Sequence, residues 1–171
     1  MMLETERLRL RPMVETDADR LFPIMNDAEV MAHWDIPEID DPDLLARIVE
    51  NQVSDMAAGK AVYWAIETLA DDGFIGICDL SEIDLWHKRG AIGFILARRA
   101  WGQGFASETV AAVIVHAAGL GLRRLAARTQ LGNRRSEAVL ERFGFKPEGL
   151  LRGHILREGE RRDCRLFGLL L

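Results

Sequence analysis

Alternating and helically spaced apolar residues predict that the chain begins with a strand followed by two helices. Within residues 6–13, leucines alternate with arginines, which is the pattern of a strand with one buried face. Thr16 can cap a first helix, and Pro23 lies within the helical pattern that follows and can end it early. A second helix is predicted to begin near Pro42 and to end before Gly59.

The middle of the chain has the pattern of strands that form the centre of a sheet. Residues 61–68 and 74–81 are predicted as strands, joined by a turn that contains Asp-Asp-Gly at 71–73. Residues 92–97 are almost continuously apolar, which is typical of a central strand covered on both faces. A helix with one apolar face follows over residues 105–118.

The last third of the chain continues with strands and one helix. Residues 124–130 alternate as a strand, and Asn133 can cap a helix that ends at Gly144. Residues 150–157 and 161–171 are predicted to close the chain as a hairpin. The resulting order, β-α-α-β-β-β-α-β-α-β-β, indicates an α/β protein with one mixed sheet and helices packed on it.

Composition limits the protein to a globular, single-domain class. The 171 residues are 49% hydrophobic and 29% charged, which excludes a disordered chain, and no linker divides residues 1–171. Apolar runs such as Val110–Val115 are far shorter than the roughly 20 residues that span a bilayer. The N-terminus is charged where a signal peptide is apolar, and Cys78 and Cys164 have no metal-ligand spacing. We therefore expect a cytoplasmic protein with no membrane partner and no metal.

Charge is distributed unevenly between the two halves of the chain. Residues 1–87 carry 20 acids and 6 bases, whereas residues 88–171 carry 7 acids and 16 bases. An acidic run at 40–43, with Asp35 and Glu38, could attract a cationic acceptor, although such runs are also typical of solvated loops. The bases of the second half are not interleaved with aromatic residues, so we expect no nucleic-acid partner.

A glycine-containing segment between the buried strand and the helix at 105–118 predicts an anion site. Gly102 and Gly104 precede the helix, whose first-turn N–H groups and dipole favour a bound phosphate. Ser107 can add a hydroxyl donor, and Arg98 and Arg99 add positive charge. A Gly-x-Gly pair alone also fits a simple tight turn.

Of three known phosphate-binding motifs, two do not fit this segment. No Walker string is present, and a dinucleotide-binding fingerprint would require a glycine where Ser107 stands. The stretch 122–129 also offers arginines where that fingerprint requires an acid. The pattern R-x-x-G-x-G is satisfied by Arg99, Gly102 and Gly104 after a buried strand, and it is the pyrophosphate loop of acyl-coenzyme A binders.

Further motifs extend along nearly the whole chain. They are Thr5-Glu6-Arg7-Leu8-Arg9-Leu10-Arg11-Pro12, Phe74-Ile75-Gly76, Ile92-Gly93-Phe94, Trp101-Gly102-Gln103-Gly104-Phe105-Ala106-Ser107-Glu108, Asn133-Arg134-Arg135-Ser136, Phe143-Gly144-Phe145, Glu148-Gly149, Arg152 and Asp163. Each is weak alone, but together they resemble the GNAT superfamily of N-acetyltransferases. The RimJ/RimL-type branch, which acetylates ribosomal proteins, is the most similar.

This resemblance implies a fold and an activity. The fold would be a central, splayed mixed sheet flanked by helices. The activity would be direct attack of a primary amine, from a protein N-terminus or a small molecule, on the thioester of acetyl-CoA. A homodimer is compatible with it. Two alternatives remain open: a non-catalytic module that binds or senses acyl-CoA, and an unrelated nucleotide-binding oxidoreductase, which the fingerprint disfavours.

The resemblance also implies which residues hold the coenzyme. Backbone groups of one strand would pair with the pantetheine arm, the glycine loop would hold the pyrophosphate, and an asparagine side chain would contact the arm. In this sequence these residues are Phe94, Ile95, Leu96, Arg99, Gly102, Gln103, Gly104, Phe105, Ala106, Ser107 and Asn133. Asn133 is equally explained as a helix cap, and the two roles are compatible.

Candidate catalytic groups follow from the same resemblance. Many GNAT enzymes protonate the sulfur with a tyrosine seven residues after the asparagine, but Leu140 stands there, and Tyr63 is the only tyrosine. In the RimJ/RimL-type branch a serine three residues after the asparagine is the proposed donor, and Ser136 matches it. An ordinary serine in the first turn of a helix remains the alternative.

The general base is less well defined by the sequence. Asp79, Glu82 and Asp84 lie on or just after the third large strand, and Glu82 is the preferred candidate. Ala91 stands where relatives often carry a glutamate. The pair at 33–34, His-Trp, lies in the helix-linking segment that shapes acceptor pockets in such enzymes, although a packed pair is also expected there.

Overall fold

The computed structural model describes all residues, 1–171. Its elements are β1 (Leu3–Glu4), β2 (Leu8–Pro12), α1 (Asp17–Met25), the 3-10 helix η1 (Val30–His33), α2 (Pro42–Ala57), β3 (Val62–Thr68), β4 (Phe74–Asp84), β5 (Arg89–Leu96), the 3-10 helix η2 (Arg98–Ala100), α3 (Phe105–Gly119), β6 (Arg124–Gln130), α4 (Arg134–Arg142), β7 (Lys146–Arg157) and β8 (Glu160–Leu170). No helix is both long and apolar enough to cross a membrane.

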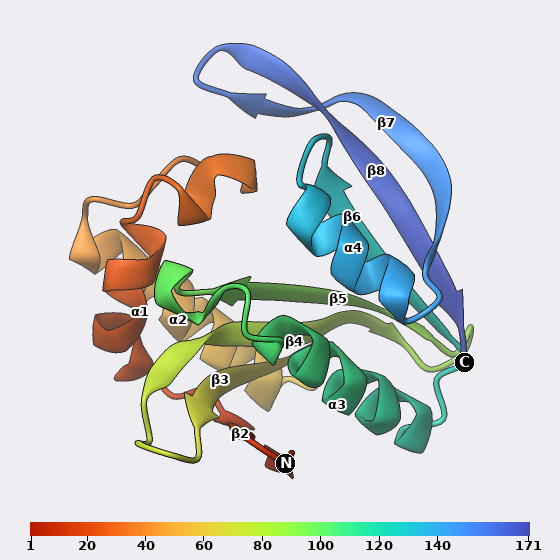
Figure 1. Ribbon diagram of the computed structural model, residues 1–171, viewed down its shortest axis with the longest axis horizontal. Helices are drawn as coiled ribbons and strands as arrows, with labels where there is room; N and C mark the ends of the chain where they lie inside the picture. The colour runs from red at the N-terminus through yellow and green to blue at the C-terminus, as the bar shows by residue number, and fades with distance from the viewer.

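The strands form one eight-stranded mixed sheet in the order β1-β2-β3-β4-β5-β6-β8-β7. All neighbouring strands are antiparallel except β5 and β6, which are parallel and joined through α3. Figure 1 shows α1 and α2 on one face of the sheet and α3 on the other, with α4 in front of β6. The α/β fold with a mixed sheet flanked by helices is therefore confirmed.

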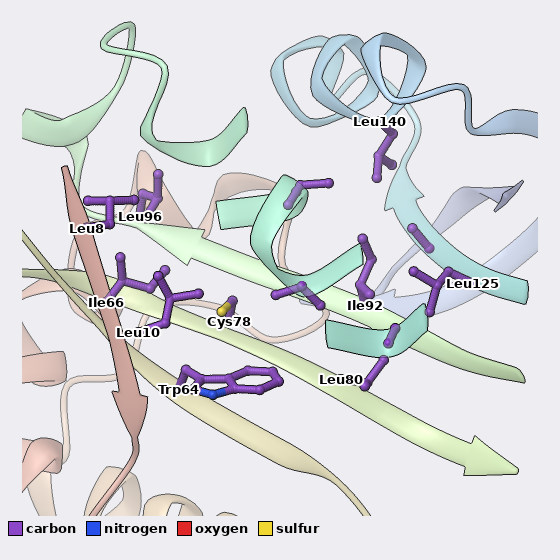
Figure 2. Close-up of a cluster of buried hydrophobic side chains, with 14 of the residues drawn as sticks. Leu8, Leu10, Trp64, Ile66, Cys78, Leu80, Ile92, Leu96, Leu125 and Leu140 are labelled. Atoms are coloured by element: carbon purple, nitrogen blue, oxygen red, sulfur yellow. The ribbon is translucent and has the colours of Figure 1, made fainter. Parts of the chain in front are cut away.

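Two hydrophobic clusters cover the two faces of the sheet. The cluster under α3 contains Trp64, Leu80 and Ile92, whose side chains are drawn in Figure 2. The cluster under α1 and α2 contains Ile95, which lies on the same strand as Ile92 but on the opposite face. Because strand side chains alternate between faces, this placement confirms that β5 is covered on both sides.

Pro23 lies inside α1 without ending it. The helix continues to Met25, and the Asn26 N–H still donates to the Phe22 carbonyl at 2.9 Å. Leu21 and Met25 are buried against the sheet. This burial offsets the one hydrogen bond that a proline removes.

The parallel strands β5 and β6 separate after a short paired stretch. Their register covers only Arg89–Ala91 against Arg124–Ala126. Beyond it, β5 stays paired with β4 up to Leu96, while β6 stays paired with β8 up to Gln130. The sheet is therefore splayed at this point, as the family resemblance implied, and one edge of β5 lacks a neighbouring strand.

Candidate active site

The unpaired edge of β5 exposes backbone polar groups to the gap beside β6. The Ala97 N–H donates to a β4 carbonyl at 2.8 Å, so by strand alternation the polar groups of Ile95 also point to β4. Those of Phe94 and Leu96 point to the gap. The Leu96 carbonyl accepts from the Trp101 indole at 3.0 Å. Phe94 thus presents its backbone N–H and carbonyl there, whereas the backbone groups of Ile95 do not face the gap.

The loop that follows β5 forms a cradle of free amides. The backbone N–H groups of residues 102–107 have no acceptor within the chain, and the Glu108 N–H is the first to close the helix, onto the Gly104 carbonyl at 3.0 Å. Gly102 and Gly104 have φ of +74° and +83°, which glycine adopts without strain. These conformations turn successive N–H groups toward the start of α3, as an anion site requires.

Arg7 fastens this loop from the N-terminal segment. Its guanidinium donates to the Gln103 carbonyl at 2.9 Å, pairs with Glu108 at 2.7 Å and lies 4.6 Å from the centre of the Phe105 ring. Burial opposes ionisation of Glu108, but hydrogen bonds from the Thr5 hydroxyl and from Arg7 lower the pKa of this carboxyl below its usual value. Sequence reasoning noticed Arg7 only as part of a motif and missed this contact.

Arg99 and Gln103 support the loop with their side chains. The Arg99 guanidinium donates to the Phe74 carbonyl, and the Gln103 side-chain amide donates to the Arg99 carbonyl at 2.7 Å. Neither residue lines the cavity beside this loop. This placement favours a structural role for the Arg99 side chain, in contrast to the coenzyme contact expected from the sequence.

A cavity of about 930 Å³ connects the free amides, the gap beside β5 and the segment around η1. Its walls come from four parts of the chain: η1 and its flanks, the end of β5, the loop with the start of α3, and the start of α4. Among the residues that line it are Phe94, Ile95, Leu96, Gly102, Gly104, Phe105, Ala106, Ser107, Asn133 and Ser136. The structure therefore brings most of the expected site residues around one space.

Asn133 and Ser136 lie at the start of α4, where this helix meets the cavity. Asn133 Oδ1 accepts the Ser136 N–H at 3.4 Å, so the side chain caps the helix. Its amide nitrogen and the Ser136 hydroxyl make no hydrogen bond within the chain. Both groups line the cavity and remain available to a ligand.

Cations outnumber acids along the cavity wall. Arg134, Arg135 and Arg142 line it, against one carboxylate, that of Glu29. The Arg135 guanidinium lies 4.2 Å from the centre of the Trp101 ring, which bridges α4 and the loop after β5. The end of the cavity between α4 and the loop after β5 is therefore suited to a phosphate-rich ligand.

Glu82 and Asp84 lie away from the cavity. They occupy the end of β4 that faces the beginning of β5, next to a register irregularity, where Glu82 has a φ of +50°. Asp84 accepts the His87 N–H at 2.9 Å and so closes a turn. Asp79 does not line the cavity either, but it lies opposite Gly93, one residue before Phe94, which does. Placement along β4 thus favours Asp79 over the preferred Glu82.

Arginine side chains hold η1 against the β7–β8 hairpin, the end of which lies beside η1 in Figure 1. The buried Arg157 donates to the carbonyls of Met31 and Trp34, and the Gln130 side chain donates to Trp34 at 2.6 Å. Arg162 reaches another η1 carbonyl at 3.2 Å. These contacts were not foreseen from the sequence, and they fix the segment that forms the other end of the cavity.

Most acids of this segment are paired with arginines. The pairs are Asp35 with Arg128, Asp27 and Glu29 with Arg98, and Glu38 with Arg157. Within the acidic run at 40–43, Asp41 caps α2 by accepting the Asp43 N–H. The pairing offsets the negative field that the sequence suggested here.

His33, the last residue of η1, lines the end of the cavity that this helix forms. Its ring lies 4.0 Å from the position that a Cβ on Gly132 would occupy. Burial first, and then the charges of Arg162 and Arg157, lower the pKa of this imidazole below its usual value. This shift favours the neutral form of the imidazole.

Comparisons with known proteins agree with this arrangement. The sequence profile described as "Acetyltransferase (GNAT) domain" matches residues 7–146. An uncharacterized N-acetyltransferase, p20, from Bacillus licheniformis is 36% identical, with 98% of this chain and 95% of p20 aligned.

Two solved structures share the fold. A RimL ribosomal L7/L12 alpha-N-protein acetyltransferase in complex with coenzyme A superposes with a TM-score of 0.90 at 22% identity, covering 100% of this chain and 98% of that one. A spermidine N-acetyltransferase from Vibrio cholerae, in complex with CoA and spermine, superposes with a TM-score of 0.84 at 20% identity, covering 97% and 96%.

Proposed function

The chain belongs to the GNAT acetyltransferase family, and from this premise we propose that it transfers the acetyl group of acetyl-CoA to the primary amine of a protein N-terminus or of a small monoamine. The observation that carries the proposal is the single cavity that joins the free amides of residues 102–107 to the unpaired edge of β5. One end of this cavity suits phosphates, and the other is open to an acceptor.

The residues present fit coenzyme A. The free amides of residues 102–107 would hold its pyrophosphate, with positive charge from Arg135 and Arg142 nearby. The gap beside Phe94 would take the pantetheine arm, toward which the Asn133 amide nitrogen can donate. The cavity of about 930 Å³ lies at the upper end of the range typical of ligand sites, about 300–1,000 Å³. When bound, acetyl-CoA supplies the acetyl group as an electrophilic thioester.

Two groups of the chain would assist the transfer. The Phe94 N–H faces the gap and would stabilise the negative charge that develops on the carbonyl oxygen, as in an oxyanion hole. The Ser136 hydroxyl would donate a hydrogen bond to the leaving sulfur. We expect Ser136→Ala to lower kcat about 10–100-fold while the Kd for coenzyme A stays unchanged, measured by steady-state kinetics and calorimetry. Equal kcat would leave Ser136 a structural role only.

The charges at the acceptor end favour an amine that carries little other positive charge. Asp35, Glu29 and Glu38 are paired with arginines, which reduces the negative charge that they offer to a polyamine. The α-amine of a protein has a pKa of about 8, and roughly a tenth of it is therefore neutral and nucleophilic at pH 7. An alkyl amine, with a pKa above about 10, is far more fully protonated.

Calorimetry and thiol release test the proposal together. Coenzyme A is titrated into the protein, with NAD as the control ligand, and acetyl-CoA is then incubated with short peptides, their N-terminally blocked forms, monoamines and spermidine. We expect coenzyme A, but not NAD, to give heat on titration into the protein. We expect acetyl-CoA to release free thiol with unblocked peptides or monoamines. Binding without thiol release from any amine would indicate a non-catalytic acyl-CoA module, and heat from NAD alone would overturn the proposal.

A further inference from the structure

Asp79 is a carboxylate of β4 on the α1–α2 face of the sheet. We propose that Asp79 is the group that accepts the proton of the attacking amine. This inference rests on the proposed function. It assigns the general base to a residue of β4 that is neither paired with a cation nor used to cap or brace an element.

The register of β4 and β5 places Asp79 beside the reacting position. Asp79 lies opposite Gly93, and a Cβ at Gly93 would lie only 2.5 Å from Asp79 Oδ1. The missing side chain thus lets the carboxylate lie against the β5 backbone, one residue before Phe94. Because strand side chains alternate, Asp79 shares its face with Ile77 and Ile95, and Ile95 lines the cavity.

The direction of attack follows from the two faces of the sheet. The free amides and α3 lie on one face, while η1 lies on the face of α1 and α2 (Figure 1). A coenzyme arm in the gap beside Phe94 would present its carbonyl at the β5 edge. An amine that enters from the η1 side would then meet this edge on the face that carries Asp79.

The charges around Asp79 favour a base that works near neutral pH. Burial raises the pKa of Asp79 to about 6, the Ser81 hydroxyl opposes this shift, and the Glu82 charge adds to it. On β3, the facing residue is Tyr63, whose own pKa is raised by burial and by the charges of Asp79 and of Asp55 on α2. β5 contributes no titratable group opposite Asp79, because glycine stands there.

Other titratable groups are less well placed. Glu29 lines the cavity but pairs with Arg98 at 3.0 Å and is largely exposed. His33 lines the cavity, but its ring lies near Gly132 at the end of β6, across the gap from β5. Asp79 is the base that the sheet itself holds next to Phe94.

The proposed step balances as follows. The amine nitrogen forms a bond to the carbonyl carbon of the thioester, and its proton passes to the Asp79 carboxylate. The carbon–sulfur bond breaks, and its electron pair remains on sulfur, which takes a proton from solvent through the Ser136 hydroxyl. Asp79 then releases its proton to solvent, and the products are the acetylated amine and coenzyme A.

Asp79→Asn tests this step because the amide keeps the shape of the side chain but cannot accept the proton. We expect kcat to fall about 100-fold or more, with the Kd for coenzyme A unchanged by calorimetry. The wild-type pH–rate profile should rise through an apparent pKa near 6, and this limb should be lost in the variant. Glu50→Gln, which removes an exposed carboxylate of α2 outside the cavity, is the matched control that keeps the wild-type rate and profile, and His33→Gln should keep the limb.

A second readout does not depend on turnover. Carbon NMR of the Asp79 carboxyl in the free protein should show a titration near pH 6, and titration near pH 4 would overturn the proposal. A wild-type kcat in Asp79→Asn would also overturn it, as would loss of the pH limb in His33→Gln rather than in Asp79→Asn. If Asp79→Asn does not fold, Asp79→Glu should keep the limb at a lower rate. Coenzyme A binding without thiol release from any wild-type sample would refute the proposed function itself, whatever the NMR titration shows.

Discussion

Removing the Asp79 charge should stabilise the folded protein at neutral pH, even as it lowers activity. The folded state raises the pKa of this carboxyl from 3.8 to about 6, so it holds the proton more tightly than the unfolded chain does. The contribution of this carboxyl to stability is therefore greatest below about pH 4, where both states are protonated, and it falls as the pH rises from 4 to 6. The shift corresponds to about 3 kcal/mol, and partial solvent contact of the side chain reduces this to about 2 kcal/mol.

Urea unfolding measures this effect directly. Wild type and Asp79→Asn should have nearly equal free energies of unfolding at pH 4, whereas at pH 7.5 the variant should be more stable by about 2 kcal/mol. The reasoning would be refuted if Asp79→Asn were less stable than wild type at pH 7.5. It would also be refuted if the two proteins differed in free energy of unfolding by the same amount at both pH values.

Three further substitutions probe the two ends of the cavity. Gly104→Val places a β-branched residue at φ +83° among the free amides. The affinity for coenzyme A, measured by calorimetry, should therefore fall at least about 100-fold. Gly59→Val, at φ +70° outside the cavity, should leave this affinity unchanged. Arg7→Ala releases the loop from the N-terminal segment and should weaken coenzyme A binding about 10-fold, whereas Arg9→Ala should not. Arg157→Ala frees η1 and should lower the free energy of unfolding by about 3 kcal/mol, measured by thermal unfolding. It should also raise the KM for the amine with little change in coenzyme A affinity. An unchanged KM would contradict the role of η1.

The sequence predicted the parts of the site that depend on local pattern. The apolar run of β5, the glycines at positive φ and the cap at Asn133 are all encoded within a few residues of one another. Their arrangement around one cavity followed from a strand, a loop and a helix in direct succession. The splay of β5 from β6 was expected from the family resemblance, and the short paired register confirms it.

Contacts between distant segments could not be predicted in this way. Arg7 and Glu108 are separated by 101 positions, and Arg157 and Met31 by 126. No periodicity or motif spacing shows that these residues meet. The choice between Asp79 and Glu82 likewise depends on the cross-strand register of β4 and β5, which an irregularity near the end of β4 alters.

The measurement that tests the central claim most directly follows both products of the reaction at once. Acetyl-CoA and an unblocked peptide are incubated with the protein, free thiol is measured by absorbance, and the peptide mass is measured in the same sample. The account predicts one acetylated peptide for each thiol released, and neither product with an N-terminally blocked peptide that has no other amine. Thiol release without acetylated peptide, or no release from any amine while coenzyme A gives no heat, would contradict it.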